Sequence, residues 1–399
     1  MIQYFQIADL IFSLEYDDET SPFAVIADKM GLVRISAGIP QIRFQWRNRP
    51  ATVKAPVTKL EKSVVGNGFF QTRTRQGDTL QLEADESGSL TVGISGPRAG
   101  AGKRFRQFLK KYWKYRFLYG ISFNEMHAKK IMYGILEPVF LAWFAGHGKT
   151  LVHSSTVEKD GKSFLFPAWG GVGKTSLMSY FLSAGWNYLG DDIAVLSTDG
   201  RLHHFPLPMH IYGYHKFVCA DMYKRMVAGM TPADRRIWDL SMKLYPPDEM
   251  SRWVRPEQVY GKERIALNSK LQTVIHMQRS SVSESLIFRE TTPQNVARYV
   301  TNTIINEIPG ILPMTSYPNS HAAIPCLPDT RQMLETLERN AAQGFSNAAV
   351  YETRSRNDSG GDLEISPGTV SRTLTFSPVE IPEKSDTLQK KQTQEDAER

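Results

Sequence analysis

The chain has 399 residues, of which 41% are hydrophobic and 22% are charged, which is typical of a soluble globular protein long enough for two domains. The net charge of +7 is modest for this length, so it permits an acidic partner without calling for nucleic acid. The two cysteines, Cys219 and Cys326, have no metal-binding spacing. This excludes a disulfide framework and leads us to expect a cytoplasmic protein.

Neither a signal peptide nor a membrane span is expected. The first 18 residues carry no basic segment and become acidic early. The longest apolar run, residues 131–146, is interrupted by Glu137 and Pro138 and is shorter than the roughly 20 residues that a span needs. We interpret this run as a buried helix.

The first 148 residues divide into two predicted parts. Residues 1–97 contain short β-type runs separated by turn residues, which predicts a small, mostly antiparallel, β-rich domain; the runs include 23–27, 32–37 and 42–46. Residues 98–148 form a predicted helical connector. Its first part, 98–116, has eight Lys or Arg and interleaved aromatic residues. Such a segment either buries an aromatic helix face or binds RNA or an acidic peptide.

Strands and helices alternate over residues 149–352, which predicts an α/β domain. We expect strands at 150–157, 163–168, 186–190 and 271–277, a hairpin over 193–205, and helices at 175–184, 292–307 and 329–343, with 215–260 mostly helical. From residue 353 to 399 the chain is rich in Ser, Thr, Glu, Lys, Pro and Gly. We expect this tail to be disordered.

A phosphate-binding loop is predicted between the second of these strands and the first helix. Residues 168–175 fit the pattern G-x-x-x-x-G-K-[ST], except that Ala168 stands at the first glycine. Glycines at 170, 171 and 173 allow backbone N–H groups to approach phosphate oxygens, and the following helix directs its positive end to the same place. Lys174 would reach the β- and γ-phosphates, and the Thr175 hydroxyl would bind Mg²⁺.

A second Gly-Lys-Thr triplet, at residues 148–150, is a decoy. It follows a helical run instead of a strand, lacks the additional glycines, and precedes a strand instead of a helix. We therefore predict that Lys149 lies in a turn and binds no phosphate.

Two adjacent acids, Asp191 and Asp192, begin seventeen positions after Lys174. A helix of about ten residues carries the chain roughly 15 Å away, and a strand of about five residues returns roughly 16 Å. We therefore expect both acids beside the phosphate loop, at the end of a neighbouring parallel strand. Asp191 would join Thr175 at Mg²⁺, and Asp192 would act as general base. The alternative is that the pair only starts the following hairpin.

Three histidines, at positions 203, 204 and 210, raise the question of a metal site. No cysteine or acid completes a metal-binding spacing with them. We predict that they pack along edge strands.

At this point the sequence resembles the HPr kinase/phosphorylase family and its HPr-kinase-related relatives. In that family a histidine precedes the loop lysine by 21 positions and an Asp pair follows it by 17. Here His153 and Asp191 stand at those distances from Lys174. The match is clearest over residues 151–208.

The resemblance implies a P-loop kinase domain of the HPr kinase/PEP carboxykinase-like type, preceded here by the small β-rich domain. It implies His153 close to the transferred phosphate, Thr175 and Asp191 on Mg²⁺, and Asp192 as the base that activates a serine hydroxyl. On its own, His153 would be an ordinary strand histidine. The implied phosphate-binding residues are Gly170, Gly171, Val172, Gly173, Lys174, Thr175 and Ser176.

The sequence departs from the family at Ala168 and in lacking a visible Glu-x-Arg-Gly stretch, which the family uses for HPr recognition and phosphorolysis. We therefore expect an ATP- and Mg²⁺-dependent kinase whose acceptor is a protein, a peptide serine or a small alcohol. A homo-oligomer is left open. Two alternatives are a catalytically silent ATP-binding regulatory module and a plain NTPase, although no later Walker B strand supports the latter.

Overall fold

The computed structural model describes residues 1–47, 49–50, 57–59, 63–74, 78–96, 115–280, 287–308, 310, 315, 324 and 326–356. Most of the basic part of the predicted connector, up to residue 114, lies outside the described residues. The predicted disordered tail does so from residue 357, but strand β19 continues to Arg356, beyond the expected start of the tail.

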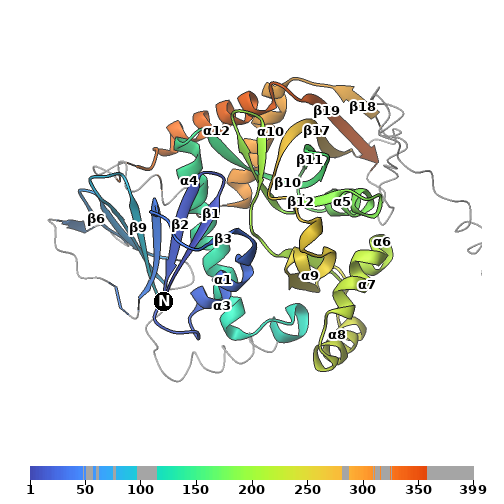
Figure 1. Ribbon diagram of the computed structural model, residues 1–399, viewed down its shortest axis with the longest axis horizontal. Helices are drawn as coiled ribbons and strands as arrows, with labels where there is room; N and C mark the ends of the chain where they lie inside the picture. Colours follow the sequence, from blue (N-terminus) through green and yellow to red (C-terminus); the bar gives the residue numbers. More distant parts are fainter. Residues whose placement is uncertain are drawn as a thin grey trace, which may run out of the picture.

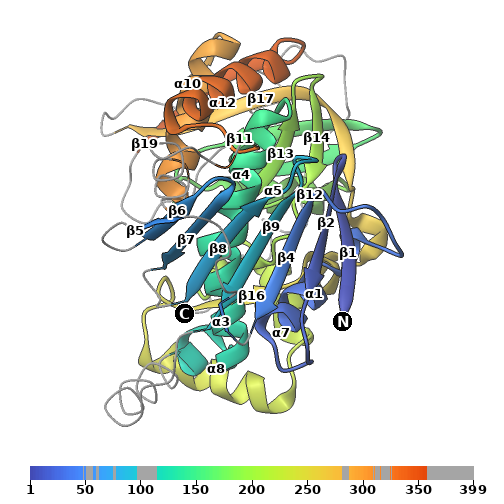
Figure 2. The same ribbon diagram turned by 90° about the vertical axis from the view of Figure 1, so that its left-hand side faces the viewer.

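The N-terminal part is a nine-stranded sheet with the order β3-β1-β2-β4-β9-β8-β7-β6-β5, seen face-on in Figure 2. Its elements are β1 (Ile2–Ile7), β2 (Leu10–Glu15), α1 (Pro22–Lys29), η1 (Gly31–Val33), β3 (Arg34–Ile35), β4 (Ile42–Arg47), β5 (Val57–Lys59), β6 (Ser63–Gly66), β7 (Phe69–Arg73), β8 (Thr79–Ala84) and β9 (Leu90–Ser95).

One of the predicted β-type runs in this part is a helix. The run 23–27 lies in helix α1, because Ser21 caps the helix with its hydroxyl and Pro22 occupies the first turn. These local start signals outweigh the β-type composition. The sheet is mostly antiparallel, as expected, although β4 pairs in parallel with both β2 and β9.

A long buried helical segment connects the two sheets. It consists of α3 (Phe123–Ile131), a π-helical turn η2 (Met132–Leu136) and α4 (Glu137–Gly146). Phe140 on α4 packs against Phe12 and Phe44 of the N-terminal sheet, with ring centroids 5.0 and 5.4 Å away, and against Phe205 on the other side at 5.6 Å. One apolar core therefore continues across α4, which lies between the two sheets in Figure 1. The run 131–146 is a buried helix, as expected.

The C-terminal part is a mixed α/β structure around an eight-stranded sheet with the main order β11-β10-β13-β14-β17-β19-β18. Its strands are β10 (Lys149–Lys159), β11 (Lys162–Pro167), β12 (Asn187–Gly190), β13 (Ile193–Ser197), β14 (Arg201–His204), β17 (Asn268–Ser280), β18 (Ile287–Glu290) and β19 (Ala349–Arg356). A separate pair is formed by β15 (Met209–Tyr212) and β16 (Ser251–Val254).

Helices cover both faces of this sheet. One apolar cluster joins the strands to α10 (Pro293–Glu307) and α12 (Thr330–Phe345). Another joins them to α5 (Lys174–Ser183), α7 (Ala220–Ala228) and α8 (Pro232–Leu244). The short helices α6 (His215–Val218), α9 (Pro256–Tyr260) and η3 (Lys262–Arg264) complete this side. Figure 1 shows α12 along the upper edge of the molecule, with α10 beside it, and α7 and α8 at the lower edge.

The expected parallel neighbour of the phosphate loop strand needs correction. Strand β12 runs in the same direction as β11 but is not adjacent to it, because β10 lies between them and pairs antiparallel with both. The number of residues between Lys174 and Asp191 predicts one helix and one returning strand of the correct direction. It does not predict how many strands lie between β11 and β12. The expectation that 215–260 is mostly helical also missed β16.

In the part of the chain that the structure describes, no helix has both the length and the apolar character needed to cross a membrane.

Candidate functional site

The phosphate loop lies between the end of β11 and the start of α5. Gly171 and Gly173 have φ angles of 75° and 104°, in the region that favours glycine. A Cβ atom at Gly171 would meet nothing within 4 Å, so the space above the loop is open. Gly173 is the N-cap of α5 and supplies no side-chain hydrogen bond. The first N–H groups of α5 are therefore available to an anion.

The two non-glycine positions of the loop serve packing. Ala168 is 3% exposed and Val172 is 7% exposed, and both belong to the apolar cluster on the α5 side of the sheet. The methyl group of Ala168 fills space in that cluster, which gives a physical reason for alanine at the first position of the pattern. Any contact of Val172 with a phosphate would come from its backbone.

Lys174 is held beneath the loop by three acceptors. Its ammonium donates to His153 Nε2 at 2.8 Å and to the carbonyl oxygens of Ala168 and Trp169, each at 3.1 Å. Because Nε2 accepts this hydrogen bond, His153 is neutral and carries its proton on Nδ1. Burial and the charge of Lys174 lower the pKa of His153 to about 3. This hydrogen bond to His153 therefore orients the Lys174 ammonium.

Asp191 and Thr175 form the candidate magnesium site. The Thr175 hydroxyl donates to the two carboxylate oxygens of Asp191 at 3.2 and 3.3 Å, and Ser155 donates to Oδ1 at 2.5 Å. Adjacent ligands of an octahedral Mg²⁺ with bonds of about 2.1 Å lie about 3.0 Å apart. The separation of the Thr175 hydroxyl oxygen and an Asp191 carboxylate oxygen is therefore close to what the ion requires. Asp191 is 6% exposed, and burial raises its pKa. A cation would favour its charged form.

Asp192 occupies a constrained turn between β12 and β13. Its φ of 74° is unusual for a residue with a side chain, and its carbonyl accepts a hydrogen bond from the N–H of Ser154 at 3.1 Å. Burial, followed by the charge of Asp191, raises the pKa of Asp192 to about 6, while Lys174 acts in the opposite direction. A carboxyl group with a pKa near 6 suits a general base at neutral pH.

The structure thus brings five of the sequence-predicted residues into one site. Hydrogen bonds connect His153 to Lys174, and Thr175 to Asp191. The charges of both aspartates act on Lys174 and oppose the lowering of its pKa by burial. Ser176, in the first turn of α5, makes no side-chain hydrogen bond to any of them in the described part of the chain.

The decoy triplet follows a helix and precedes a strand, as predicted, but Lys149 is the first residue of β10 and does not lie in the turn that we expected. It follows α4 and opens β10, with Lys149 only 8% exposed. The Lys149 ammonium donates to Asp9 at 2.8 Å and to the carbonyl of His147 at 3.2 Å. It therefore connects the two sheets and faces no glycine loop.

The three histidines considered for a metal have separate partners. His203 bonds to Ser197, His204 to the carbonyl of Leu189 and His210 to Tyr133. Over the residues that the structure describes, no group of three His, Cys, Asp or Glu side chains is arranged to hold a metal ion.

Sequence reasoning missed several residues around Asp192. Lys129 and Glu307 affect its pKa, and the buried Glu137 feels the charge of Asp192. Glu137 is 3% exposed, and its Oε1 has no hydrogen-bond partner among the residues that the structure describes. Burial raises the pKa of Glu137 well above the usual value. An acid inside an apolar run was the signal for Glu137. Lys129 and Glu307 carried no local signal.

Comparisons with known proteins give little further support. No family model matches the chain, and no curated protein matches it. Among solved structures, an HPr(Ser) kinase/phosphatase from Coxiella burnetii matches over 36% of this chain and 77% of its own, with 10% sequence identity and a TM-score of 0.22. A similarity of this extent does not establish a shared fold, so the proposals below depend on the residues of the site.

The role of His153 can be tested by substitution. If the site transfers phosphate, we expect His153→Gln to lower kcat/KM for that transfer less than tenfold, because the glutamine amide oxygen can still accept a hydrogen bond from Lys174. His153→Leu should lower it by roughly 10- to 100-fold. For the wild type we expect kcat/KM to fall below about pH 6, because the Asp191–Asp192 pair becomes protonated there. Both variants should show the same fall. The pH–rate profile is the measurement. If this acidic limb disappeared in His153→Gln, the histidine would be the titrating group.

Proposed function

We propose that this protein is an ATP- and Mg²⁺-dependent kinase that transfers the γ-phosphate to a hydroxyl group. The observation that carries the proposal is the meeting of three features at one place: a glycine loop at a helix N-terminus, the buried Lys174, and the Asp191–Asp192 turn. The spacing of His153, Lys174 and Asp191 shared with the HPr kinase/phosphorylase family supports the same assignment.

In this proposal each residue has a separate task. The N–H groups of residues 170–176 bind phosphate oxygens, and Lys174 exchanges its loop carbonyl partners for the β- and γ-phosphates. Thr175 and Asp191 hold Mg²⁺, and the ion, when bound, neutralises charge on the phosphates. Ser155 fixes the orientation of Asp191 through its hydrogen bond.

Asp192 acts on the acceptor. The acceptor oxygen forms a bond to the γ-phosphorus as the bond from that phosphorus to the β–γ bridging oxygen breaks, and the electron pair of this bond leaves with ADP. The hydroxyl proton passes to the Asp192 carboxylate. The position of Asp192 immediately after Asp191 is consistent with this division of labour, since one acid faces Thr175 and the other remains available.

One observation favours a silent ATP-binding module as the second candidate. Lys174 already has three acceptors within the protein, so its ammonium is satisfied without any phosphate. In such a module the site would bind nucleotide and transfer nothing.

The test is incubation of the wild-type protein with γ-labelled ATP, Mg²⁺ and a cell extract as the source of acceptors, with nucleotide affinity measured in parallel. We expect labelled acceptor that disappears when EDTA removes Mg²⁺. Binding without transfer would indicate the silent module. Rapid phosphate release that does not depend on an acceptor would indicate a plain NTPase.

A further inference from the structure

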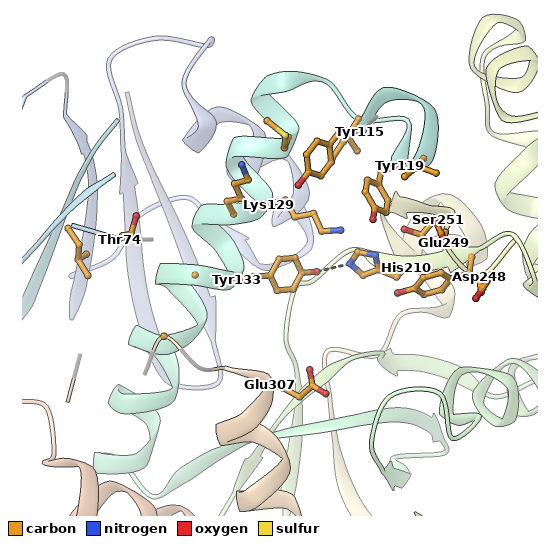
Figure 3. A pocket seen from close by; sticks show the side chains of 18 of the residues that line it. Thr74, Tyr115, Tyr119, Lys129, Tyr133, His210, Asp248, Glu249, Ser251 and Glu307 are labelled. Carbon is orange, nitrogen blue, oxygen red and sulfur yellow. Dashed lines mark hydrogen bonds between the residues drawn. The ribbon is translucent and has the colours of Figure 1, made fainter. Parts of the chain in front are cut away.

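A cavity outside the candidate site is large enough for a small molecule. Its volume is about 770 Å³, within the usual range of ligand sites. Its walls come from β7 and β8 of the N-terminal sheet, from residues 115–121, from α3 and η2, and from β15 and β16 (Figure 3). Among the lining residues that the structure describes, none belongs to the phosphate loop or to the Asp191–Asp192 turn. A ligand in this cavity would therefore contact a different set of residues from the proposed nucleotide.

One face of the α3–η2 segment forms a wall of the cavity. The spacing of three or four residues between its lining side chains places them on one side of a helix. The π-helical turn η2 begins directly after α3, and turns of this kind are frequent at functional sites. The residues of this wall are Met126, Lys129, Lys130, Tyr133 and Gly134.

The Lys129 ammonium lies between two rings of the cavity. Its nitrogen is 5.4 Å from the ring centroid of Tyr119 and 5.8 Å from that of Tyr133. Within the described part of the chain it makes no hydrogen bond or ion pair. Burial lowers the pKa of Lys129 to about 8, while the charge of Asp192 acts in the opposite direction, so the ammonium is mostly protonated at pH 7. A half-buried cation without a polar partner is suited to bind an anion.

The acidic residues of the cavity are more exposed than its lysines. Asp248, Glu249 and Glu307 line it at exposed positions. Lys129 and Lys130 are half-buried. Water and salt screen exposed charges strongly and partly buried charges less. A ligand inside the cavity is therefore affected more by the lysines than by the acids.

Aromatic rings form much of the remaining wall. The rings of Tyr115 and Tyr119 have centroids 5.5 Å apart. The hydroxyl of Tyr133 is hydrogen-bonded to His210 at 3.0 Å, which Figure 3 marks with a dashed line. Burial lowers the pKa of His210 to about 3, so its ring adds no charge. With Tyr212, these rings give the cavity flat surfaces on which an aromatic ligand can pack.

We propose that this cavity binds a small aromatic anion, such as an aryl carboxylate. The Lys129 ammonium pairs with the negative group. Because the rings of Tyr119 and Tyr133 flank that ammonium, the body attached to the negative group lies against them, and an aromatic body gains stacking or edge-to-face contacts there. The proposal goes beyond the kinase function and does not depend on it.

The experiment compares ligands of similar shape and different charge. At pH 7, 1-naphthoate is anionic, 1-naphthylmethanol is neutral and 1-naphthylmethylamine is cationic. Decahydro-1-naphthoate keeps the negative charge and lacks the aromatic rings. The affinity of the full chain for each is measured by isothermal titration calorimetry. We expect 1-naphthoate to bind about tenfold more tightly than the neutral and cationic compounds, and about threefold more tightly than the saturated carboxylate.

Variants then test the assigned groups. Lys129→Gln should weaken binding of 1-naphthoate about tenfold and change that of 1-naphthylmethanol less than about twofold, while Lys129→Arg should keep the preference for the anion. Tyr119→Leu should remove the advantage of 1-naphthoate over the saturated carboxylate. The matched control is Lys162→Gln, which should change no affinity. Lys162 is exposed at the hairpin end of β10 and β11 and does not line the cavity.

A competition experiment separates the cavity from the phosphate loop. Saturating Mg-tripolyphosphate, an anion without a ring, should leave the affinity for 1-naphthoate unchanged. Displacement by tripolyphosphate, equal affinity for the three naphthyl compounds, or an unchanged affinity for 1-naphthoate in Lys129→Gln would each reject the inference. The absence of binding up to about 1 mM ligand would also reject it. None of these results bears on phosphate transfer from ATP, which has its own test.

Discussion

Replacing Asp192 with asparagine should lower kcat for phosphate transfer by about 10²- to 10⁴-fold, the usual contribution of a general base. Asparagine has nearly the same shape and tolerates the left-handed φ of 74° as well as aspartate does. The proposed magnesium ligands, Thr175 and Asp191, are unchanged in this variant. We therefore expect the affinity for Mg-ATP to change by less than about threefold, because the backbone and the phosphate loop are unaffected.

The same substitution should stabilise the nucleotide-free protein above pH 6. The pKa of Asp192 is raised from 3.8 to about 6, so the folded state binds this proton more tightly than the unfolded state. Wild-type stability therefore falls as the pH rises from about 4 to about 6 and stays lower above that range, by at most about 3 kcal/mol. The asparagine variant avoids this loss, and its thermal midpoint at pH 7.5 should be several degrees higher.

Asp160→Asn is the matched control. Asp160 also has a positive φ, 52°, but it is exposed in the turn between β10 and β11. Its replacement should change neither kcat nor the dependence of the thermal midpoint on pH. Wild-type kcat in Asp192→Asn would exclude the general-base role. A thermal midpoint at pH 7.5 that is lower in Asp192→Asn than in the wild type would contradict the proposal that the buried charge of Asp192 destabilises the folded protein.

The local part of the site was accessible from the sequence because it depends on short stretches of chain. Lys174 and Thr175 begin the helix that the loop glycines introduce, and Asp191 follows one helix and one strand later. The contact of His153 with Lys174 required the family resemblance, since only that gave meaning to a spacing of 21 residues. No pattern within the sequence distinguishes His153 from other strand histidines.

The cavity could not be predicted in the same way. Lys129 on α3 and Glu307 at the end of α10 are far apart in the chain, and only the folded structure places both of them in the lining of one cavity. The sheet order was hidden for a related reason. Strand β10 is long enough to pair with β12 and β13 along one edge and with β11 along the other, and amphipathic pattern does not encode such sharing.

The two Gly-Lys-Thr triplets provide a final comparison within one chain. Lys174→Met should reduce phosphate transfer by about 10²- to 10³-fold, since it removes the buried ammonium that the proposed function assigns to the phosphates. Affinity for Mg-ATP should fall as well. The variant also leaves His153 Nε2 without its donor and removes a positive charge that acts on both aspartates, so its nucleotide-free form should be less stable.

Lys149→Met makes the same chemical change outside the phosphate loop. It removes the bond to Asp9, whose side chain is 73% exposed and can be solvated, so the cost should be no more than about 1 kcal/mol. Affinity for a fluorescent ATP analogue and the rate of transfer should match the wild type. Loss of nucleotide binding in Lys149→Met would place the phosphate at residues 148–150. Wild-type nucleotide affinity in Lys174→Met would show that Lys174 does not bind it. Either result would remove the basis for the kinase proposal, since only the second triplet is hydrogen-bonded to the aspartate turn.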